Sequence, residues 1–394
     1  MKKSFFILPL LLLFLGCEKE ALPTTVEPST EEPVENQDPE ETSIYTVLNG
    51  SIGHWHESTL LSSDGNVIVV GNKRTGGHRQ MLVTKTTPTG EVIFSTLCDL
   101  PNSRALGVHE DSQQHIYLAG YTTGENGEDR RRLAVAKLDQ DGMVIWERVY
   151  QDEYEIYGTG ITALNDNEIV VCGAEREKQN LILLKIDSLG EELQFKTVDT
   201  PDKYKVPSSI LVLQDGNILI TDYDNSVFNL SWFDPAFQLV IEQSYGQGSR
   251  VCRSAIQLAD GSLVVVGKQT HTKAGSNKID SSKVLIAKID ANGELLWEKE
   301  AGDTHYLNDG QSIAVNQDGS FVINGYALSE HTTKTDHMLI YVDPEGNEIN
   351  ATYFTDEKTF RGANIIKLEN GRNVMTGGYQ GGIYFLNVDN YGSK

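Results

Sequence analysis

From Ser43 onward, the chain alternates short apolar runs with polar turns of the Asp-Gly or Asn-Gly kind. A Gly follows six of the seven runs, and Thr221-Asp222 takes its place after the fourth. The runs are Val67–Val70, Ile116–Ala119, Ile169–Val171, Ile218–Ile220, Leu263–Val266, Phe321–Ile323 and Asn373–Thr376. Short β-rich runs between such turns predict strands in hairpins, and no sustained 3.6-residue apolar period competes with them.

The same unit recurs seven times. Its closing glycines run from Gly71 to Gly377, a mean spacing of 51 residues, which is typical of a repeat architecture. Each unit has room for four strands, which we expect in the second unit at Gly107–Glu110, His115–Gly120, Leu133–Leu138 and Met143–Val149. Such a sheet is apolar on both faces and must pack between neighbours. The fold class is therefore all-β, a seven-bladed β-propeller of four-stranded blades.

The two ends of the repeat region are complementary. The last unit has a third strand at Ile383–Val388 and a turn at Asp389–Gly392, but no fourth strand follows. Ser43–Asn49 has the pattern of a fourth strand and precedes the first unit. We therefore expect the N-terminal strand to pair in the C-terminal blade, close the ring and remove exposed sheet edges.

The first 42 residues differ from the repeats. A basic start and an apolar run from Phe5 to Leu15 predict a signal peptide over residues 1–16, since the run is too short to span a bilayer comfortably. Residues 17–42 hold nine acids, four prolines and almost nothing apolar, which predicts a disordered, extended linker. The propeller domain then covers residues 43–394.

Gly16-Cys17 resembles a bacterial lipobox, although Phe14 stands where that motif usually has Leu. The resemblance implies cleavage before Cys17 and lipidation of its thiol, so that the partner of this end of the chain is a membrane. Glu18-Lys19-Glu20 resembles the acidic export signal of surface lipoproteins of the Bacteroidota, with the start of an acidic linker as the alternative. The implied location is the outer membrane of the cell envelope, facing outward.

The repeats resemble a family of secreted bacterial propeller repeats. Gly120-Tyr121-Thr122, Lys137-Leu138-Asp139, Gly142 and Trp146 carry the likeness in the second unit. It extends over most of the repeat region and implies the fold but no activity, because propellers have many unrelated functions.

Charge and cysteine content exclude some functions. Acids outnumber bases 56 to 33, and the net charge of −23 argues against nucleic acid as a partner. Removing the signal and linker leaves −17 on the repeats. With Cys17 lipidated, Cys98, Cys172 and Cys252 remain, and we interpret them as buried small side chains rather than a redox pair.

In a propeller the loops between blades, and those between the second and third strands, lie on one face. Many of the cations of the domain fall in these loops, so we expect them around one opening, where an oligosaccharide or acidic peptide could bind, with a merely solvated loop face as the alternative. The loops between blades carry His54, Trp55, His56, Arg104, Tyr157, Lys205, Arg250, Arg253, His305, Asn308, Asp309 and Arg361. The other loops add Lys73, Arg74, His78, Arg79, Arg130, Arg131, Arg132, Arg176, His271, Lys273, His331 and His337. The predicted binding residues are His54, Trp55, Arg104, Arg250, Arg253 and Arg361.

A catalytic set can also be assembled from these loops. His56 or His305 would be the general base, Tyr157 the acid, and Arg361 would neutralise a uronate, which resembles propeller-type polysaccharide lyases. His54 and His56 could also ligate a metal, but no third ligand is identifiable, and the Asp-Gly turns have too few oxygens for calcium. We therefore expect no metal and no cofactor.

Two functions from different classes follow, on a chain expected to be a monomer. The first is a non-catalytic surface lipoprotein that binds a glycan or protein through its loop face. The second is a lyase or hydrolase of an acidic polysaccharide on the same scaffold, and an accessory subunit of an envelope complex is a further alternative.

Overall fold

The computed structural model describes residues 45–47, 58–75, 77–123, 130–151, 154–178, 180–199, 206–223, 227–246, 248–273, 275, 279–304, 306–329, 335–354, 360–379 and 382–388. The chain divides into two units, Met1–Glu40 and Glu41–Lys394, and all the described residues belong to the second. No helix among these residues is long and apolar enough to cross a membrane.

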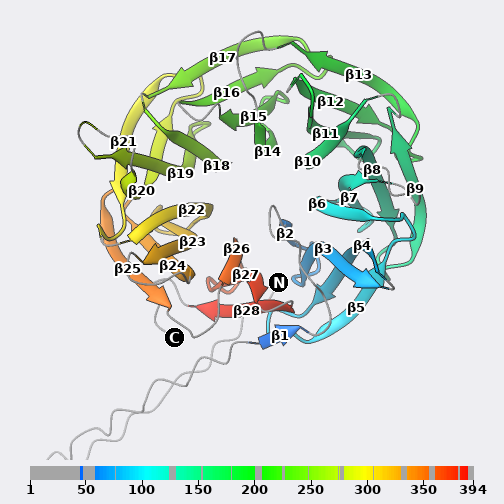
Figure 1. The fold of residues 1–394 in the computed structure, drawn as a ribbon, viewed down its shortest axis with the longest axis horizontal. Helices are drawn as coiled ribbons and strands as arrows, with labels where there is room; N and C mark the ends of the chain where they lie inside the picture. The colour runs from blue at the N-terminus through cyan, green and yellow to red at the C-terminus, as the bar shows by residue number, and fades with distance from the viewer. Residues whose placement is uncertain are drawn as a thin grey trace, which may run out of the picture. The chain divides into compact units, whose positions relative to one another are not determined.

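The described residues form 28 strands in antiparallel sheets, with the strands of each sheet mostly following one another along the chain (Figure 1). Four separate four-stranded sheets come first: β2 (Ser58–Leu61), β3 (Val67–Thr75), β4 (His78–Thr86) and β5 (Val92–Leu97); β6 (Ser103–Glu110), β7 (Ile116–Thr122), β8 (Arg132–Leu138) and β9 (Val144–Tyr150); β10 (Ile156–Asn165), β11 (Glu168–Glu175), β12 (Leu181–Ile186) and β13 (Glu192–Val198); β14 (Val206–Val212), β15 (Ile218–Tyr223), β16 (Phe228–Phe233) and β17 (Leu239–Tyr245). In Figure 1 the first strand of each sheet faces a central opening and the fourth lies on the outside.

Eight strands then share one sheet: β18 (Arg250–Gln257), β19 (Leu263–Thr272), β20 (Ile279–Ile289), β21 (Leu295–Ala301), β22 (Tyr306–Val315), β23 (Phe321–Ser329), β24 (Thr335–Val342) and β25 (Glu348–Phe354). Its two halves are joined by one parallel residue pair, Ser282 with Leu307. The cause is the length of β20, which continues past the pairing of β21 that begins at Val284. There the Ser282 hydroxyl donates to the backbone carbonyl of Asn308 at 2.9 Å, and the side-chain amide of Asn308 donates to the backbone carbonyl of Ser282 at 3.0 Å.

The last sheet has the order β1 (Tyr45–Val47), β28 (Gly382–Val388), β27 (Asn373–Tyr379) and β26 (Phe360–Lys367). β1 therefore comes from the start of the unit and pairs antiparallel with β28, Tyr45 opposite Phe385. The prediction of an all-β propeller built of four-stranded blades is confirmed. The predicted count of seven separate blades is corrected: five separate four-stranded sheets are present in the described residues, because the extension of β20 fuses the other strands into the eight-stranded sheet.

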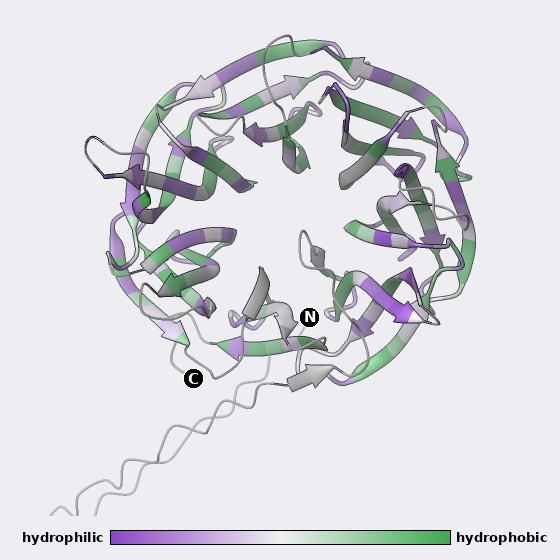
Figure 2. Cartoon of the chain, in the orientation of Figure 1, coloured by the Kyte–Doolittle hydropathy of each residue, from purple (hydrophilic) through white to green (hydrophobic). Residues whose placement is uncertain are grey.

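The hydrophobic core lies between neighbouring sheets rather than inside one globule. Green, apolar segments and purple, polar segments alternate along the strands (Figure 2). One cluster joins Ile68 of β3 to Ile116 of β7, and another joins Val67 to Phe385, which packs the first sheet against the last. Cys98, Cys172 and Cys252 are buried and form no disulfide with another described residue, which confirms their interpretation as core side chains. Each sheet thus buries both faces against neighbours.

A β-bulge recurs in the innermost strands. The register shifts by one residue between Ala105 and Gly107 in β6, and in the same way around positions 159 in β10, 208 in β14, 253 in β18 and 311 in β22; in β26 it lies between positions 361 and 364. A bulge turns its extra residue away from the regular alternation, here toward the central opening.

Where a Gly closes the second strand, as at Gly120 and Gly267, it makes room for this bulge. A Cβ on Gly120 would lie 1.8 Å from the carbonyl oxygen of Arg104, and a Cβ on Gly267 would lie 1.8 Å from that of Val251. Real Cβ atoms are essentially never closer than 3.0 Å to such a neighbour. At these positions the Gly therefore allows the close approach of the bulged strand, whereas the fourth unit has its bulge beside Asp222.

Candidate functional site

None of the four residues proposed for catalysis has a described side chain. His54, Trp55, His56 and His305 lie outside the described residues, as does Cys17. Tyr157 lies in β10 and Arg361 in β26, but only their backbone is described. The proposed lyase set therefore remains a prediction.

The remaining predicted binding residues have three different surroundings. Arg250 forms a bidentate pair with Glu298 of β21, and its side chain is only 11% exposed. Arg253 lies on the central opening, and Arg104 lines a separate cavity on the loop face. These two places are the candidate sites.

The loop-face cavity has a volume of about 470 Å³ and brings five arginines together from three neighbouring sheets. They come from the ends of strands and the long loops, so residues up to about a hundred positions apart in the chain meet here. The lining residues are Arg74, Gly77, Arg79, Asn102, Arg104, Tyr121, Thr123, Arg131 and Arg176; we call the five arginines the arginine cluster.

Two guanidinium groups of the arginine cluster lie against the aromatic ring of Tyr121. The guanidinium carbon of Arg131 is 4.8 Å from the ring centroid and that of Arg104 is 6.0 Å away, within the range of cation–π attraction. Tyr121 is 7% exposed, and burial raises the pKa of its hydroxyl while Arg131 and Arg79 act in the opposite direction. The phenol is therefore protonated at neutral pH and adds no negative charge.

The hairpin of β3 and β4 places Arg74 directly opposite Arg79. Like charges at directly opposed positions destabilise a sheet. Among the described residues, neither of these arginines nor Arg104 forms an ion pair, whereas Arg176 contacts Glu155 at 2.5 Å. Arg74, Arg79 and Arg104 therefore gather positive charge on a chain that is acidic as a whole.

Hydrogen bonds fix the loops around the cluster. His78 Nδ1 lies 3.3 Å from Asn102 Oδ1, which ties the tip of the β3–β4 hairpin to the β5–β6 connection. Ser103 accepts a hydrogen bond from the backbone N–H of Met81 at 2.9 Å and donates to the Leu100 carbonyl at 2.6 Å. These contacts anchor the connection at the base of the site.

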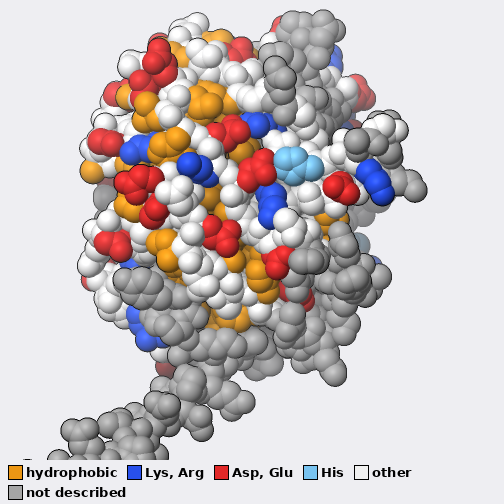
Figure 3. All heavy atoms as spheres, turned by 90° about the vertical axis from the view of Figure 1, so that its left-hand side faces the viewer, with side chains coloured by type: hydrophobic (Ala, Val, Ile, Leu, Met, Phe, Trp, Pro, Cys, Tyr) orange, Lys and Arg blue, Asp and Glu red, His pale blue; other side chains and the backbone are white. Residues whose placement is uncertain are grey.

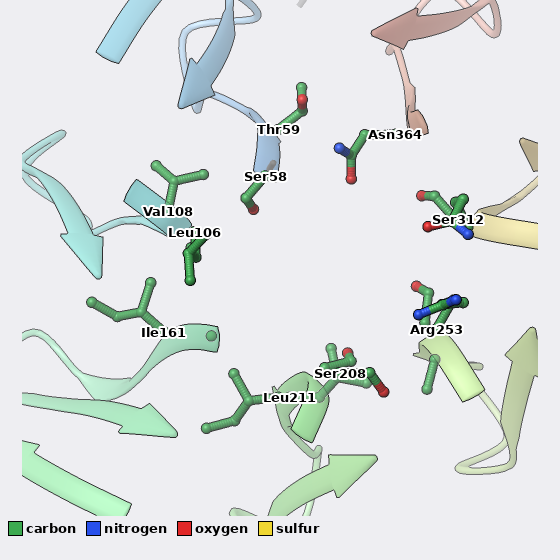
Figure 4. A pocket seen from close by; sticks show the side chains of 17 residues that line it. Ser58, Thr59, Leu106, Val108, Ile161, Ser208, Leu211, Arg253, Ser312 and Asn364 are labelled. Carbon is green, nitrogen blue, oxygen red and sulfur yellow. The ribbon is translucent and has the colours of Figure 1, made fainter. Parts of the chain in front are cut away.

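The second cavity lies on the axis of the ring, with a volume of about 310 Å³ (Figure 4). Its walls come from the innermost strands of all the sheets. Its one charged residue among the described ones is Arg253, which donates from Nε and Nη2 to the Asp309 carboxylate at 3.2 and 3.0 Å.

Asp309 is buried among cations. Lys268 Nζ lies 3.5 Å from its Oδ2, and the Tyr326 hydroxyl donates to the same oxygen at 3.1 Å. Burial alone would raise the pKa of this carboxyl, but Arg253 and Lys268 lower it. Asp309 had been expected in a loop; it lies in β22, where it fixes the guanidinium of Arg253.

His337 had also been expected in a loop and lies fully buried in β24. The Tyr384 hydroxyl is 2.8 Å from its Nε2, and burial lowers its pKa to about 3. His337 is therefore a neutral core residue. The Asp-Gly positions are turn-formers: Asp139 Oδ1 accepts from the N–H groups of Asp141 and Met143 at 3.0 and 2.8 Å. No group of three or more His, Cys, Asp or Glu within the described ranges is placed to hold a metal ion.

The outer wall differs from the arginine cluster. On the side that carries β21 and β25, acidic, basic and apolar side chains are intermixed (Figure 3). Leu295 and Leu296 of β21 and Ile349 of β25 are 45%, 54% and 57% exposed. This mixed surface shows no concentration of one charge.

No family model matches the sequence, and no curated protein matches it. Among solved structures, the chain is similar to a streptogramin B lyase, at 14% identity and a TM-score of 0.59 over 88% of this chain and 97% of that one. It is also similar to a putative 6-phosphogluconolactonase from Bacteroides fragilis (13%, TM-score 0.54, 84% and 97%) and to a polysaccharide lyase (11%, TM-score 0.53, 91% and 94%). At such identities the likeness shows that the chain shares the β-propeller fold of lyase- and lactonase-type proteins, and nothing of its activity.

Proposed function

We propose that this protein binds an acidic glycan through the arginine cluster and does so as a lipid-anchored protein on the outer face of a bacterial outer membrane. The observation that carries the proposal is the opposition of Arg74 and Arg79 beside Arg104, none of which forms an ion pair among the described residues. An arrangement that costs stability in the empty protein gains favourable charge pairs when an anion binds.

Several features favour a glycan over other polyanions. The guanidinium groups are spread over three sheets, so they suit carboxylates or sulfates spaced along a flexible chain. Duplex nucleic acid is long and uniformly charged, and it would meet the strongly acidic remainder of a chain of net charge −23. A cavity of about 470 Å³ lies within the usual range of about 300–1,000 Å³ for small-molecule sites and suits a short stretch of sugar units.

The anchor and the ring complete the proposal. Lipid chains on Cys17 would hold the protein at the membrane, and the acidic linker of residues 18–42 would keep the loop face clear of it. We infer a ring of seven four-stranded units in which the eight-stranded sheet counts as two and β1 closes the last. Its support is the seven apolar clusters that the described residues form, one of which joins Val264 of β19 to Ile323 of β23 across that sheet.

The experiment is a glycan array probed with the full chain in detergent. We expect polyuronates or sulfated glycans to bind and neutral glucans not to bind, with binding weakened by salt because exposed charge pairs are screened. Equal binding to neutral and acidic glycans would refute the proposal. Release of the lipoprotein from intact cells by an added protease tests its surface exposure.

A second candidate is a lyase acting on the same class of glycan. Its support is the similarity in fold to a polysaccharide lyase over 91% of this chain, together with the predicted residues His56, Tyr157, His305 and Arg361. Product analysis of any bound polyuronate separates the two functions. A lyase forms a new unsaturated sugar end that absorbs ultraviolet light, whereas a binding protein leaves the chain length unchanged.

A further inference from the structure

The axial cavity has two chemically different walls. In Figure 4, Leu106, Val108, Ile161 and Leu211 line one side, and these come from β6, β10 and β14. Hydroxyl and amide side chains line the rest of the circumference, from β2, β14, β18, β22 and β26. They are Ser58, Thr59, Ser208, Ser209, Ser254, Gln311, Ser312 and Asn364.

The bulges contribute to both walls. Four bulged residues at equivalent positions line the cavity, and each is of a different kind: Leu106, Ser208, Arg253 and Gln311. The β-bulge is thus repeated, while the side chain of the bulged residue differs from strand to strand. A repeated scaffold that presents different groups to one space is suited to recognising a ligand without rotational symmetry.

Arg253 supplies a fixed positive charge to the polar wall. Its pairing with Asp309 raises the pKa of the guanidinium, although burial acts in the opposite direction, and its guanidinium carbon lies 5.6 Å from the Tyr223 ring centroid. With Lys268 also beside Asp309, two cations face one carboxylate, and the group is net positive. An anion entering the cavity meets a guanidinium that is already oriented.

Gln311 has an unsatisfied donor in the same region. Its side-chain Nε2 is buried and, among the described residues, has no hydrogen-bond partner. Burying such a donor destabilises a protein unless an acceptor is found. A turn of the Gln311 side chain toward the cavity would let an acceptor oxygen of a ligand satisfy this donor, beside Arg253 on the neighbouring inner strand.

We propose that the axial cavity binds one acidic sugar unit of the uronic acid type, separately from the arginine cluster. Its carboxylate would pair with Arg253, its hydroxyl groups would bond to the serine and amide side chains, and its C–H face would lie against Leu106, Ile161 and Leu211. A pyranose is itself divided into an apolar ring face and a polar edge, which matches the two walls. The volume of about 310 Å³ is small for a site and suits a single unit rather than a chain.

The test is a titration of the full chain in detergent with glucuronate, galacturonate and glucose, followed by ligand-observed NMR or calorimetry. We expect a uronate to bind at least about tenfold more tightly than glucose, because one charge-assisted pair separates them. Arg253→Gln should remove that preference. Equal affinity for uronate and glucose, or unchanged uronate binding by a folded Arg253→Gln protein, would overturn the proposal.

Arg253→Gln could also unfold the protein, because it leaves Asp309 with less compensation. Ser254→Leu is the second variant: it leaves the Arg253–Asp309 pair in place and fills part of the cavity. We expect it to fold and to lose uronate binding, and wild-type binding by this variant would contradict the proposal. Arg372→Gln, at an exposed position that lines neither cavity, is the matched control. If uronate binding were lost in Arg104→Gln instead, the anion would belong to the arginine cluster and the axial site would be refuted.

Discussion

The close approach of the bulged strand β18 to Gly267 predicts that substitution of this Gly strongly destabilises the protein. Substitution by Ala would place a methyl carbon 1.8 Å from the carbonyl oxygen of Val251 and 2.8 Å from its carbonyl carbon. Because both neighbours are backbone, no side-chain rotation can relieve the overlap. β18 and β19 must move apart by more than an ångström where Cys252 pairs with Gly267, and the bulge that presents Arg253 must change with them.

The cost can be built from its parts. Separating the strands weakens the ladder hydrogen bonds, at about 0.5–1.5 kcal/mol each. Holding a backbone in a poor conformation costs about 1–3 kcal/mol more. We therefore expect Gly267→Ala to lower the free energy of unfolding by about 4 kcal/mol, at the upper end of single substitutions.

Gly65→Ala is the matched control. Gly65 has φ +82° and nothing within 4 Å of an added Cβ, so the substitution costs only the strain of a left-handed residue, about 1–2 kcal/mol. Urea denaturation of both variants, followed by tryptophan fluorescence, measures the difference. Gly267→Ala should also lose the uronate preference of the axial cavity. If the two variants were equally stable, the account of the repeated Gly would be wrong.

Three further predictions follow from buried groups. Asp309→Asn should lower the free energy of unfolding by about 3–5 kcal/mol in urea denaturation, because Arg253 and Lys268 lose their buried counter-ion. Asp260→Asn removes an exposed partner of a lysine and should lower it by less than about 1 kcal/mol. Similar losses in the two variants would mean that the buried network is not stabilising. His337 has a folded-state pKa of about 3, which is below its unfolded value, so the unfolded chain binds the extra proton. The free energy of unfolding should therefore fall as the pH drops below about 6.5, by up to about 1.4 kcal/mol per pH unit. His337→Gln should make this pH dependence weaker, and an unchanged dependence would contradict the burial of His337. The three buried cysteines should react with a thiol reagent only after unfolding, because burial raises the pKa of those at positions 98 and 252, and fast labelling of the native protein would refute their burial.

The hairpins could be predicted from the sequence because turn chemistry is local. Asp139 and Gly142 specify their turn within four residues, and the observed β9 begins at Val144, one residue from the expected start. The fourth unit shows where this local rule fails. Phe237 takes φ 60° at the turn position that other units give to Gly, and its ring is fully buried against the neighbouring strands.

The sites depended on information that the sequence carries only indirectly. Arg74, Arg79 and Arg104 could be assigned to the loop face, but their meeting around Tyr121 depends on how neighbouring sheets pack. The bulge at Arg253 has no signal of its own in one repeat, because the residue there differs in every strand. The sequence feature that accompanies this bulge is Gly267 at the end of the next strand, which had been interpreted only as part of the repeat.

The extension of β20 brings it beside β22, and one exchange of side-chain hydrogen bonds holds the two strands together. Ser282 and Asn308 bond each other's backbone carbonyls across the two halves, and neither residue belongs to the repeated pattern. A count of blades from the repeat therefore predicts separate sheets where the structure has a joined one.

The arginine cluster is tested most directly by titrating the full chain with a polyuronate at several salt concentrations, for the wild type and for the double variant Arg79→Gln/Arg104→Gln. Each lost charge-assisted contact is worth about 1.5–3 kcal/mol, so we predict that the double variant binds at least about a hundredfold more weakly and that its affinity depends less on salt. Arg372→Gln should bind as the wild type does. Equal affinity of the double variant and this control, at every salt concentration, would contradict the assignment of the loop-face cavity as the glycan site.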